Sequence, residues 1–188
     1  MPIQFNSFVF ASPTRTASNW FRTACAVAGM DRNKRGIHEP FAKGEKLHRV
    51  TMVRHPVAWL HSMYYSHNCG WTGTRLGDML SAEANRICFA EFVEWYLKNE
   101  PGLVGRIFDL YKADTTIRVE DLPGAAVDFL RLRGVSEAAL AAIAAMPVVN
   151  GWTGLPPQKM TAGLPLSDEL TAAILSAEHA YCSRWGYT

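Results

Sequence analysis

Apolar residues near the start of the chain form first a continuous run and then a periodic pattern. Residues 8–11 are an unbroken apolar run, typical of a buried parallel strand, and Pro13 breaks the run. From Ser18 onward, apolar residues recur at roughly helical spacing, and Gly29 is a suitable C-terminal stop for a helix. The pattern therefore predicts a strand and a helix joined by a tight loop over residues 14–18.

Similar patterns recur along the rest of the chain. We expect a short second strand over residues 36–40 that ends at Pro40, because proline lacks the N–H group that a strand ladder needs. Further strands are expected at residues 47–53 and 115–119. Helical spacing is found at residues 57–65, 89–97, 124–133, 136–146 and 167–181.

The loop over residues 14–18 has the composition of an anion site. A helix N-terminus after a buried strand offers backbone N–H groups and the positive end of the helix dipole, both of which favour phosphate. Arg15 adds a charge, Thr16 and Ser18 add hydroxyls, and Asn19 adds an amide. The alternative is an ordinary capped helix with an exposed arginine. The loop lacks G-x-x-x-x-G-K-S/T, which disfavours an ordinary NTPase P-loop.

Length and charge limit the classes of function. The 188 residues, 48% of them hydrophobic, suit one domain with a substantial core. Nineteen basic and seventeen acidic residues give a formal charge of +2, which is too balanced for a general nucleic-acid or membrane-surface protein. We therefore expect no nucleic-acid partner, and any basic patch should be local.

Cysteine spacing and hydropathy favour a cytoplasmic protein without a metal site. The four cysteines, at positions 25, 69, 88 and 182, show no C-x-x-C spacing, so reduced thiols are expected. His61 and His67 lack a third ligand at a suitable spacing. The first residues do not resemble a signal peptide, and no apolar stretch has the 18 or so residues that a membrane span needs.

The first loop is similar to a motif of one enzyme family. R-T-A-S-N-W-F at residues 15–21 resembles the 5′-phosphosulfate loop of sulfotransferases that use PAPS (3′-phosphoadenosine 5′-phosphosulfate), commonly R/K-S-G-T-T-W-L. Ala17 stands where that family usually has glycine, and alanine adopts a positive φ at a higher energetic cost. The resemblance assigns the phosphosulfate end of PAPS to Arg15, Thr16, Ala17, Ser18, Asn19 and Trp20.

A second segment resembles the family's 3′-phosphate site. R-H-P-V-A-W-L-H-S at residues 54–62 carries an arginine and a serine eight residues apart, as that segment does. Arg54 would leave the end of a strand, and Ser62 would lie about two turns into the next helix, so that both can reach one phosphate. The resemblance also places Lys159, in a late loop, against the same phosphate.

Two adjacent residues are candidates for the base that deprotonates the acceptor. Glu39 is the first choice, because some bacterial carbohydrate sulfotransferases resemble this arrangement, with a glutamate after the second strand. His38 is the second choice, since histidine titrates nearer to neutral pH, whereas Glu39 needs burial to raise its pKa. In an extended strand the two cannot face one site, and either can instead be a surface polar residue.

The resemblance implies a three-layer α/β fold, the P-loop-like sulfotransferase fold, with a central parallel sheet and helices on both faces. It implies a single domain over residues 1–188 that transfers a sulfuryl group from PAPS to the hydroxyl of a carbohydrate or small molecule. Arg15 would be catalytic by stabilising the leaving phosphate, and no metal is expected. Two alternatives remain, an ATP-dependent phosphotransferase and a non-catalytic nucleotide-binding protein. The acceptor is not identified, and a homo-oligomer is left open.

Overall fold

The computed structural model describes residues 3–5, 7–30, 38–67, 87–147 and 166–187. The chain forms two compact units. Unit 1 comprises Met1–Arg54 and Ile107–Asn150, and unit 2 comprises His55–Arg106 and Gly151–Thr188. Strands and helices are both present in the described residues, which confirms the predicted α/β class. Each unit is described by itself below.

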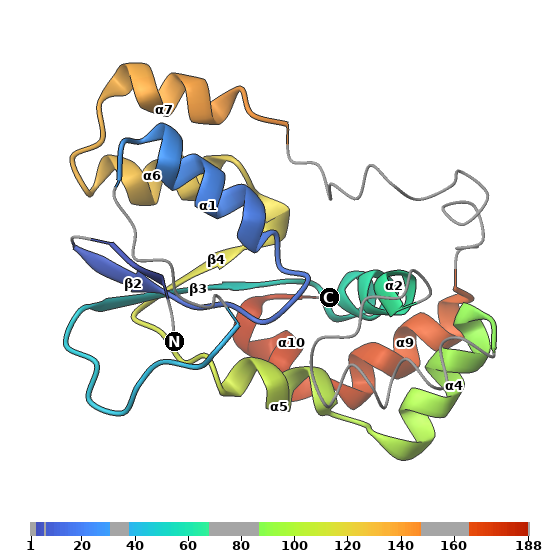
Figure 1. Cartoon of the computed structure of the whole chain (residues 1–188). Coiled ribbons are helices and arrows are strands. Elements are labelled where there is room, and N and C mark those ends of the chain that lie inside the picture. Colours follow the sequence, from blue (N-terminus) through green and yellow to red (C-terminus); the bar gives the residue numbers. More distant parts are fainter. Residues whose placement is uncertain (1–2, 6, 31–37, 68–86, 148–165, 188) are drawn as a thin grey trace. The chain divides into compact units, whose positions relative to one another are not determined.

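Unit 1 contains a four-stranded mixed sheet (Figure 1). Its strands, in spatial order, are β1 (Ile3–Gln4), β2 (Phe8–Phe10), β3 (His48–Val53) and β4 (Thr115–Arg118). β2, β3 and β4 are mutually parallel, as predicted, whereas β1 pairs antiparallel with β2 at the edge. The sheet is therefore mixed, and its parallel part brings the carboxyl ends of β2 and β3 to one edge.

Three helices of unit 1, α1 (Ser18–Val27), α6 (Gly124–Arg131) and α7 (Glu137–Ala144), lie over the same face of this sheet (Figure 1). Alternate strand residues point into the core beneath them, because successive strand side chains face opposite sides. The core residues contributed by the strands include Phe8, Phe10, Val50, Met52 and Ile117. The expected third layer, with helices on the other face as well, stays a prediction.

The core of unit 1 is built around aromatic rings. Phe21 of α1 packs 4.6 Å from Phe10 between ring centroids, and Phe129 of α6 meets Phe8 edge-on at 5.1 Å. Phe8, Phe10 and Phe21 have no exposed surface. Burial of each ring is worth roughly 1.5–3 kcal/mol. The apolar residues that predicted β2 and α1 are thus the residues that hold the two elements together.

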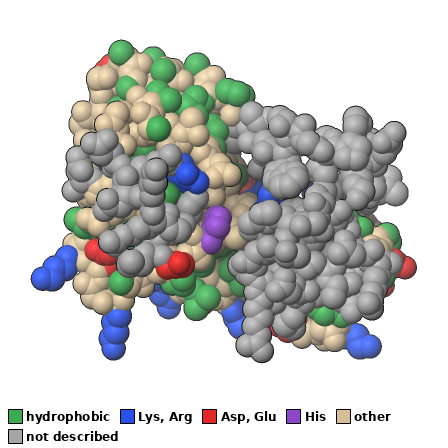
Figure 2. Space-filling view, in the orientation of Figure 1, with side chains coloured by type: hydrophobic (Ala, Val, Ile, Leu, Met, Phe, Trp, Pro, Cys, Tyr) green, Lys and Arg blue, Asp and Glu red, His purple; other side chains and the backbone are tan. Residues whose placement is uncertain are grey.

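α7 is the alanine-rich helix expected from the sequence. Ser136 caps it by accepting a hydrogen bond from the backbone N–H of Ala139. Leu140 and Ile143 are buried against the core, whereas the alanines of this helix are mostly exposed. Figure 2 shows hydrophobic side chains over the part of the surface where Figure 1 draws α7.

The second strand expected at residues 36–40 is not found in the described part of that segment. Residues 36 and 37 lie outside the described residues, and residues 38–40 form a turn, a bend and irregular chain with no strand. The backbone carbonyl of His38 accepts a hydrogen bond from the Tyr111 hydroxyl instead of joining a ladder. Pro40 has no N–H to donate to a neighbouring strand, so it does not supply a ladder bond either.

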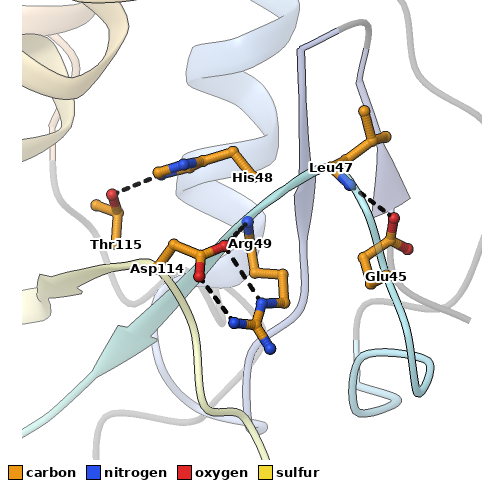
Figure 3. A network of polar contacts seen from close by, with 6 residues as sticks. All are labelled: Glu45, Leu47, His48, Arg49, Asp114 and Thr115. Carbon is orange, nitrogen blue, oxygen red and sulfur yellow. Dashed lines mark hydrogen bonds and ion pairs between the residues drawn. The ribbon is translucent and has the colours of Figure 1, made fainter.

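A polar network fixes the register of β3 against β4 at the amino end of the strands (Figure 3). The Arg49 guanidinium pairs with Asp114 at 2.7 Å, and the backbone N–H of Arg49 donates to the same carboxylate at 2.8 Å. These bonds hold the pKa of Asp114 at about 2, well below its ordinary value. His48 and Thr115 lie 2.7 Å apart, and Glu45 accepts from the backbone of Leu47 at 3.0 Å.

The described part of unit 2 is helical. Its helices are α2 (Pro56–His67), α4 (Phe89–Asn99), the start of α5 (Leu103–Asp109), α9 (Asp168–Ala177) and α10 (His179–Trp185). The predicted apolar stripe of α4 is buried. Among the residues that the structure describes, no helix has the length and apolarity needed to cross a membrane.

A buried carboxylate links three helices of unit 2. Glu178, between α9 and α10, is 2% exposed and accepts hydrogen bonds from the Tyr96 hydroxyl, from the backbone N–H of Val104 at 3.0 Å and from that of Gly105 at 2.8 Å. Gly105 allows this close approach, because a Cβ at this position would lie 3.3 Å from both Glu178 and Tyr181, which is tighter than an ordinary contact. Burial and the neighbouring carboxylate raise the pKa of Tyr96, so its hydroxyl remains a donor.

Candidate functional site

The loop between β2 and α1 is held together by its own hydroxyl groups. Thr16 Oγ1 donates to the carbonyl of Pro13 at 2.6 Å and also contacts the hydroxyl of Ser12. Ser12 and Thr16 have no exposed surface. The Thr16 hydroxyl is therefore engaged within the loop, which leaves the backbone N–H of Thr16 as its group for a ligand.

Two residues of this loop adopt a backbone conformation that costs energy. Arg15 has a φ of 67° and Ala17 a φ of 53°, both in the left-handed region. For residues with a Cβ, each costs roughly 1–2 kcal/mol. Ala17 is the N-cap of α1 and stands where the resembling family usually has glycine, so its backbone adopts a conformation that glycine takes freely. Such strain persists where surrounding contacts impose it, often at ligand-binding loops.

Replacing Ala17 by glycine should stabilise the protein. Relief of the strained φ should raise the free energy of unfolding by roughly 1–2 kcal/mol. The greater freedom of glycine in the unfolded chain lowers it by about 0.4–1 kcal/mol. We expect the free energy of unfolding to rise by about 0.5–1 kcal/mol in urea titrations. Ala26→Gly, at an exposed helical position of the same helix, is the matched control and should lower it by about 1 kcal/mol. A loss of stability in both variants would show that Ala17 is not strained.

Arg54 meets the loop from the neighbouring strand. It directly follows β3, and its Nη1 donates to the carbonyl of Arg15 at 3.1 Å. The position of Arg54 beside this loop follows from the parallel pairing of β2 and β3, which puts the carboxyl ends of the two strands next to each other. The bond also fixes the carbonyl of a strained residue. Two arginines, Arg15 and Arg54, are thereby associated with the loop over residues 11–17.

His38 approaches the loop from the connection between α1 and β3. Its Nδ1 lies 2.9 Å from the carbonyl oxygen of Ser12, which can only accept, so Nδ1 carries the proton. Burial lowers the pKa of His38 below 6.5, the hydrogen bond to Ser12 acts in the opposite direction, and the positive charge of Arg22 lowers it further. At neutral pH, His38 is therefore a neutral imidazole whose Nε2 lone pair can accept a proton.

Glu39 lies in a different environment. Its position is exposed, whereas the sequence argument for a glutamate base required burial. His38, by contrast, is half-buried, and its ring is hydrogen-bonded to the carbonyl of Ser12 between β2 and α1. The geometry of the described residues favours His38 over Glu39 as the base.

The first turn of α1 offers mainly backbone groups. The side chain of Ala17 cannot accept a capping hydrogen bond, and the first turn contains no acidic residue. The first N–H groups of a helix have no intrahelical acceptor, so those of Ser18 and Trp20 are the natural contacts for an anion. Asn19 is exposed, and its side-chain oxygen accepts a hydrogen bond from Arg22 at 3.2 Å.

Arg22 is a cation of this site that sequence reasoning missed. It lies three residues after Asn19 and four after Ser18 on α1, a spacing that puts it on the same helical face as the first turn. Its charge acts on His38, as described above. The helical spacing alone was a signal that could have identified it.

The described residues do not test whether the predicted contacts of the 3′-phosphate converge. Ser62 lies on α2 in unit 2 and is 8% exposed, whereas Arg54 belongs to unit 1. Lys159 lies outside the described residues. The convergence of these residues on one phosphate therefore stays a prediction.

The described residues contain no group of three or more histidines, cysteines or acids placed to hold a metal ion. Their cysteines, Cys25, Cys88 and Cys182, are free thiols. In comparisons with known proteins, no protein-family model, curated protein or solved structure matches the chain. The resemblance of residues 15–21 and 54–62 to sulfotransferase motifs thus stands on those motifs and on the geometry described above.

Proposed function

We propose that the protein transfers a sulfuryl group from PAPS to the hydroxyl of a carbohydrate or small-molecule acceptor, on a P-loop-like sulfotransferase fold. The observation that carries the proposal is the strained loop before α1, in which Arg15 and Ala17 both have positive φ and Arg54 bonds the Arg15 carbonyl. This loop combines a helix N-terminus with two arginines after a buried strand, which suits a phosphosulfate group.

In this proposal the loop holds the charged end of the donor. Backbone N–H groups from Thr16 to Trp20 contact the oxygens of the phosphosulfate, and Arg15 supplies the charge-assisted hydrogen bonds. Arg54 contributes to the 3′-phosphate while it also supports the loop. The exposed amide of Asn19 is available to the same oxygens.

His38 is the base in the proposed reaction. Its Nε2 accepts the proton of the acceptor hydroxyl as that oxygen attacks sulfur in line. The sulfur–oxygen bond to the 5′-phosphate breaks, and its electron pair stays on the phosphate oxygen of adenosine 3′,5′-bisphosphate. Arg15 and the helix N-terminus stabilise the negative charge that collects on this phosphate.

Binding of adenosine 3′,5′-bisphosphate tests the proposal without knowledge of the acceptor. We expect calorimetric titration to show tighter binding of the bisphosphate than of ADP, and Arg54→Ala to weaken bisphosphate binding by roughly 10- to 100-fold, the value of a charge-assisted hydrogen bond. Arg54 also holds the Arg15 carbonyl, so Arg54→Ala can weaken the binding of ADP as well. The loss of ADP affinity would measure how much Arg54 supports the loop, apart from any contact with the 3′-phosphate. Arg49→Ala, at the amino end of the same strand, should leave both affinities unchanged.

Three results would contradict this proposal. Equal or absent binding of the two nucleotides would remove the 3′-phosphate site. Tight binding of ATP with Mg²⁺ would favour the phosphotransferase alternative. Binding of the bisphosphate without any turnover of PAPS, tested against a panel of hydroxyl acceptors and water, would leave a non-catalytic nucleotide-binding protein.

A further inference from the structure

A buried tyrosine contacts the backbone of the proposed base. Tyr111 follows α5 in the chain, and its N–H bonds the carbonyl of Phe108 at 3.0 Å. Its side chain is 7% exposed, and its hydroxyl donates to the backbone carbonyl of His38 at 2.6 Å. Burial raises the pKa of Tyr111 to about 12, so the hydroxyl retains the proton that it donates across the pH range of a working enzyme.

His38 needs such a contact because its own segment is irregular. Residues 38–47 belong to no helix or strand, so no ladder of backbone bonds fixes the position of His38. The ring is bonded to Ser12 and the backbone to Tyr111. Two bonds from separate parts of the chain therefore fix the residue at its two ends, whereas a single bond would leave it free to pivot.

We propose that Tyr111 is a positioning residue that holds the His38 backbone so that Nδ1 stays on the Ser12 carbonyl and Nε2 faces the reacting hydroxyl. This inference rests on the proposed function, in which His38 is the base. Tyr111 acts through His38 and touches no reacting atom. The hydroxyl group is the essential part, because a phenylalanine ring fills the same space without donating to the carbonyl.

NMR of ¹⁵N-histidine-labelled protein tests the positioning directly. His38→Gln identifies the His38 signals among those of the six histidines. In the native protein the neutral ring should carry its proton on Nδ1 and should titrate below its ordinary pKa of 6.5. In Tyr111→Phe we expect a mixture of the two tautomers and a pKa closer to the ordinary value, since the loosened segment admits water.

Turnover of PAPS, followed as release of adenosine 3′,5′-bisphosphate with water as the acceptor, should fall by up to about 10²-fold in Tyr111→Phe, the effect of a misplacement of about 1 Å. Tyr64→Phe is the matched control, because the Tyr64 hydroxyl also donates to a backbone carbonyl, that of Ile87, at 3.0 Å in unit 2. It should leave the His38 signals and turnover as they are.

Unchanged His38 signals in Tyr111→Phe would overturn the inference, even if the variant were less stable. A native His38 with its proton on Nε2 would overturn it without any variant. The binding titration tests the proposed function separately. If the His38 signals change as expected but the native protein does not bind adenosine 3′,5′-bisphosphate, Tyr111 positions His38 and the proposed function is wrong.

Discussion

Replacing His38 by glutamine is expected to lower the turnover of PAPS by roughly 10²- to 10⁴-fold, the usual contribution of a general base. Glutamine is a polar side chain of similar length, but it has no nitrogen that accepts a proton. Binding of adenosine 3′,5′-bisphosphate should remain, because the proposed donors to that ligand are the loop, the α1 N-terminus and Arg54. A loss confined to turnover separates a base from a binding residue.

The pH profile gives the same prediction a second readout. Only the neutral imidazole has a lone pair on Nε2, so turnover requires deprotonated His38. Because burial lowers the pKa of His38, the acidic limb of native turnover should lie at a lower pH than an ordinary histidine would give, as the imidazole becomes protonated there. The residual turnover of His38→Gln should lack this acidic limb.

Two further variants identify the residue responsible. His48→Gln removes another half-buried histidine, one that bonds Thr115 at the amino end of β3, and should keep native turnover. Glu39→Gln tests the carboxylate that the sequence placed first. If Glu39→Gln abolishes turnover and His38→Gln does not, the base is Glu39 and the assignment of His38 is wrong.

The elements of the sheet and its covering helices were predictable because their apolar residues are local signals. The run at residues 8–11 became β2, and the run at 47–53 became β3. Gly29 ends α1 as expected, since its positive φ lets the backbone N–H of Met30 bond the carbonyl of Cys25. Patterns of this kind depend on neighbouring residues only, so they can be recognised in the sequence without knowledge of the fold.

The internal bonding of the site was not predictable in the same way. The side chain of Thr16 was expected to face a ligand, but it turns inward because Ser12 and the Pro13 carbonyl offer partners within the loop. The contact between Tyr111 and His38 joins residues 73 positions apart, and no local pattern indicates such a pair. The sequence indicated where the loop lies, and tertiary contacts decide which of its groups remain for a ligand.

The same limit applies to Glu178, which the sequence presents as an ordinary polar residue of the last helical segment. Its partners Tyr96, Val104 and Gly105 lie 73 to 82 positions earlier. Hydropathy gives a glutamate no reason to be buried, since carboxylates are rarely buried without partners. The burial of the Glu178 carboxylate can be explained only when the hydrogen-bond donors around it are known.

Replacing Glu178 by leucine should reduce the free energy of unfolding of unit 2 by about 3–5 kcal/mol. The substitution fills similar volume but leaves the backbone N–H groups of Val104 and Gly105 and the Tyr96 hydroxyl without an acceptor in a buried place. Each orphaned donor costs roughly 1–3 kcal/mol. Glu178→Gln should show a smaller loss, because its amide oxygen still accepts from these donors and only its NH₂ group faces a donor.

Tryptophan fluorescence in urea titrations measures this effect, because five of the six tryptophans belong to unit 2 and only Trp20 to unit 1. Glu100→Leu is the matched control in the same unit. Glu100 pairs with Arg106 at the surface, 2.7 Å away, and such exposed pairs are worth about 1 kcal/mol or less.

Two opposing terms decide the result for Glu178. Burial of a carboxylate is costly, and replacing a buried ion pair by apolar side chains is often neutral or stabilising, because all charged partners leave together. Here two of the partners are backbone N–H groups, which no substitution at position 178 removes. Their unmet hydrogen bonds should outweigh the relief from desolvation. If Glu178→Leu is as stable as the native protein, this ordering is wrong, and the start of α5 has another acceptor or reaches water once the carboxylate is gone.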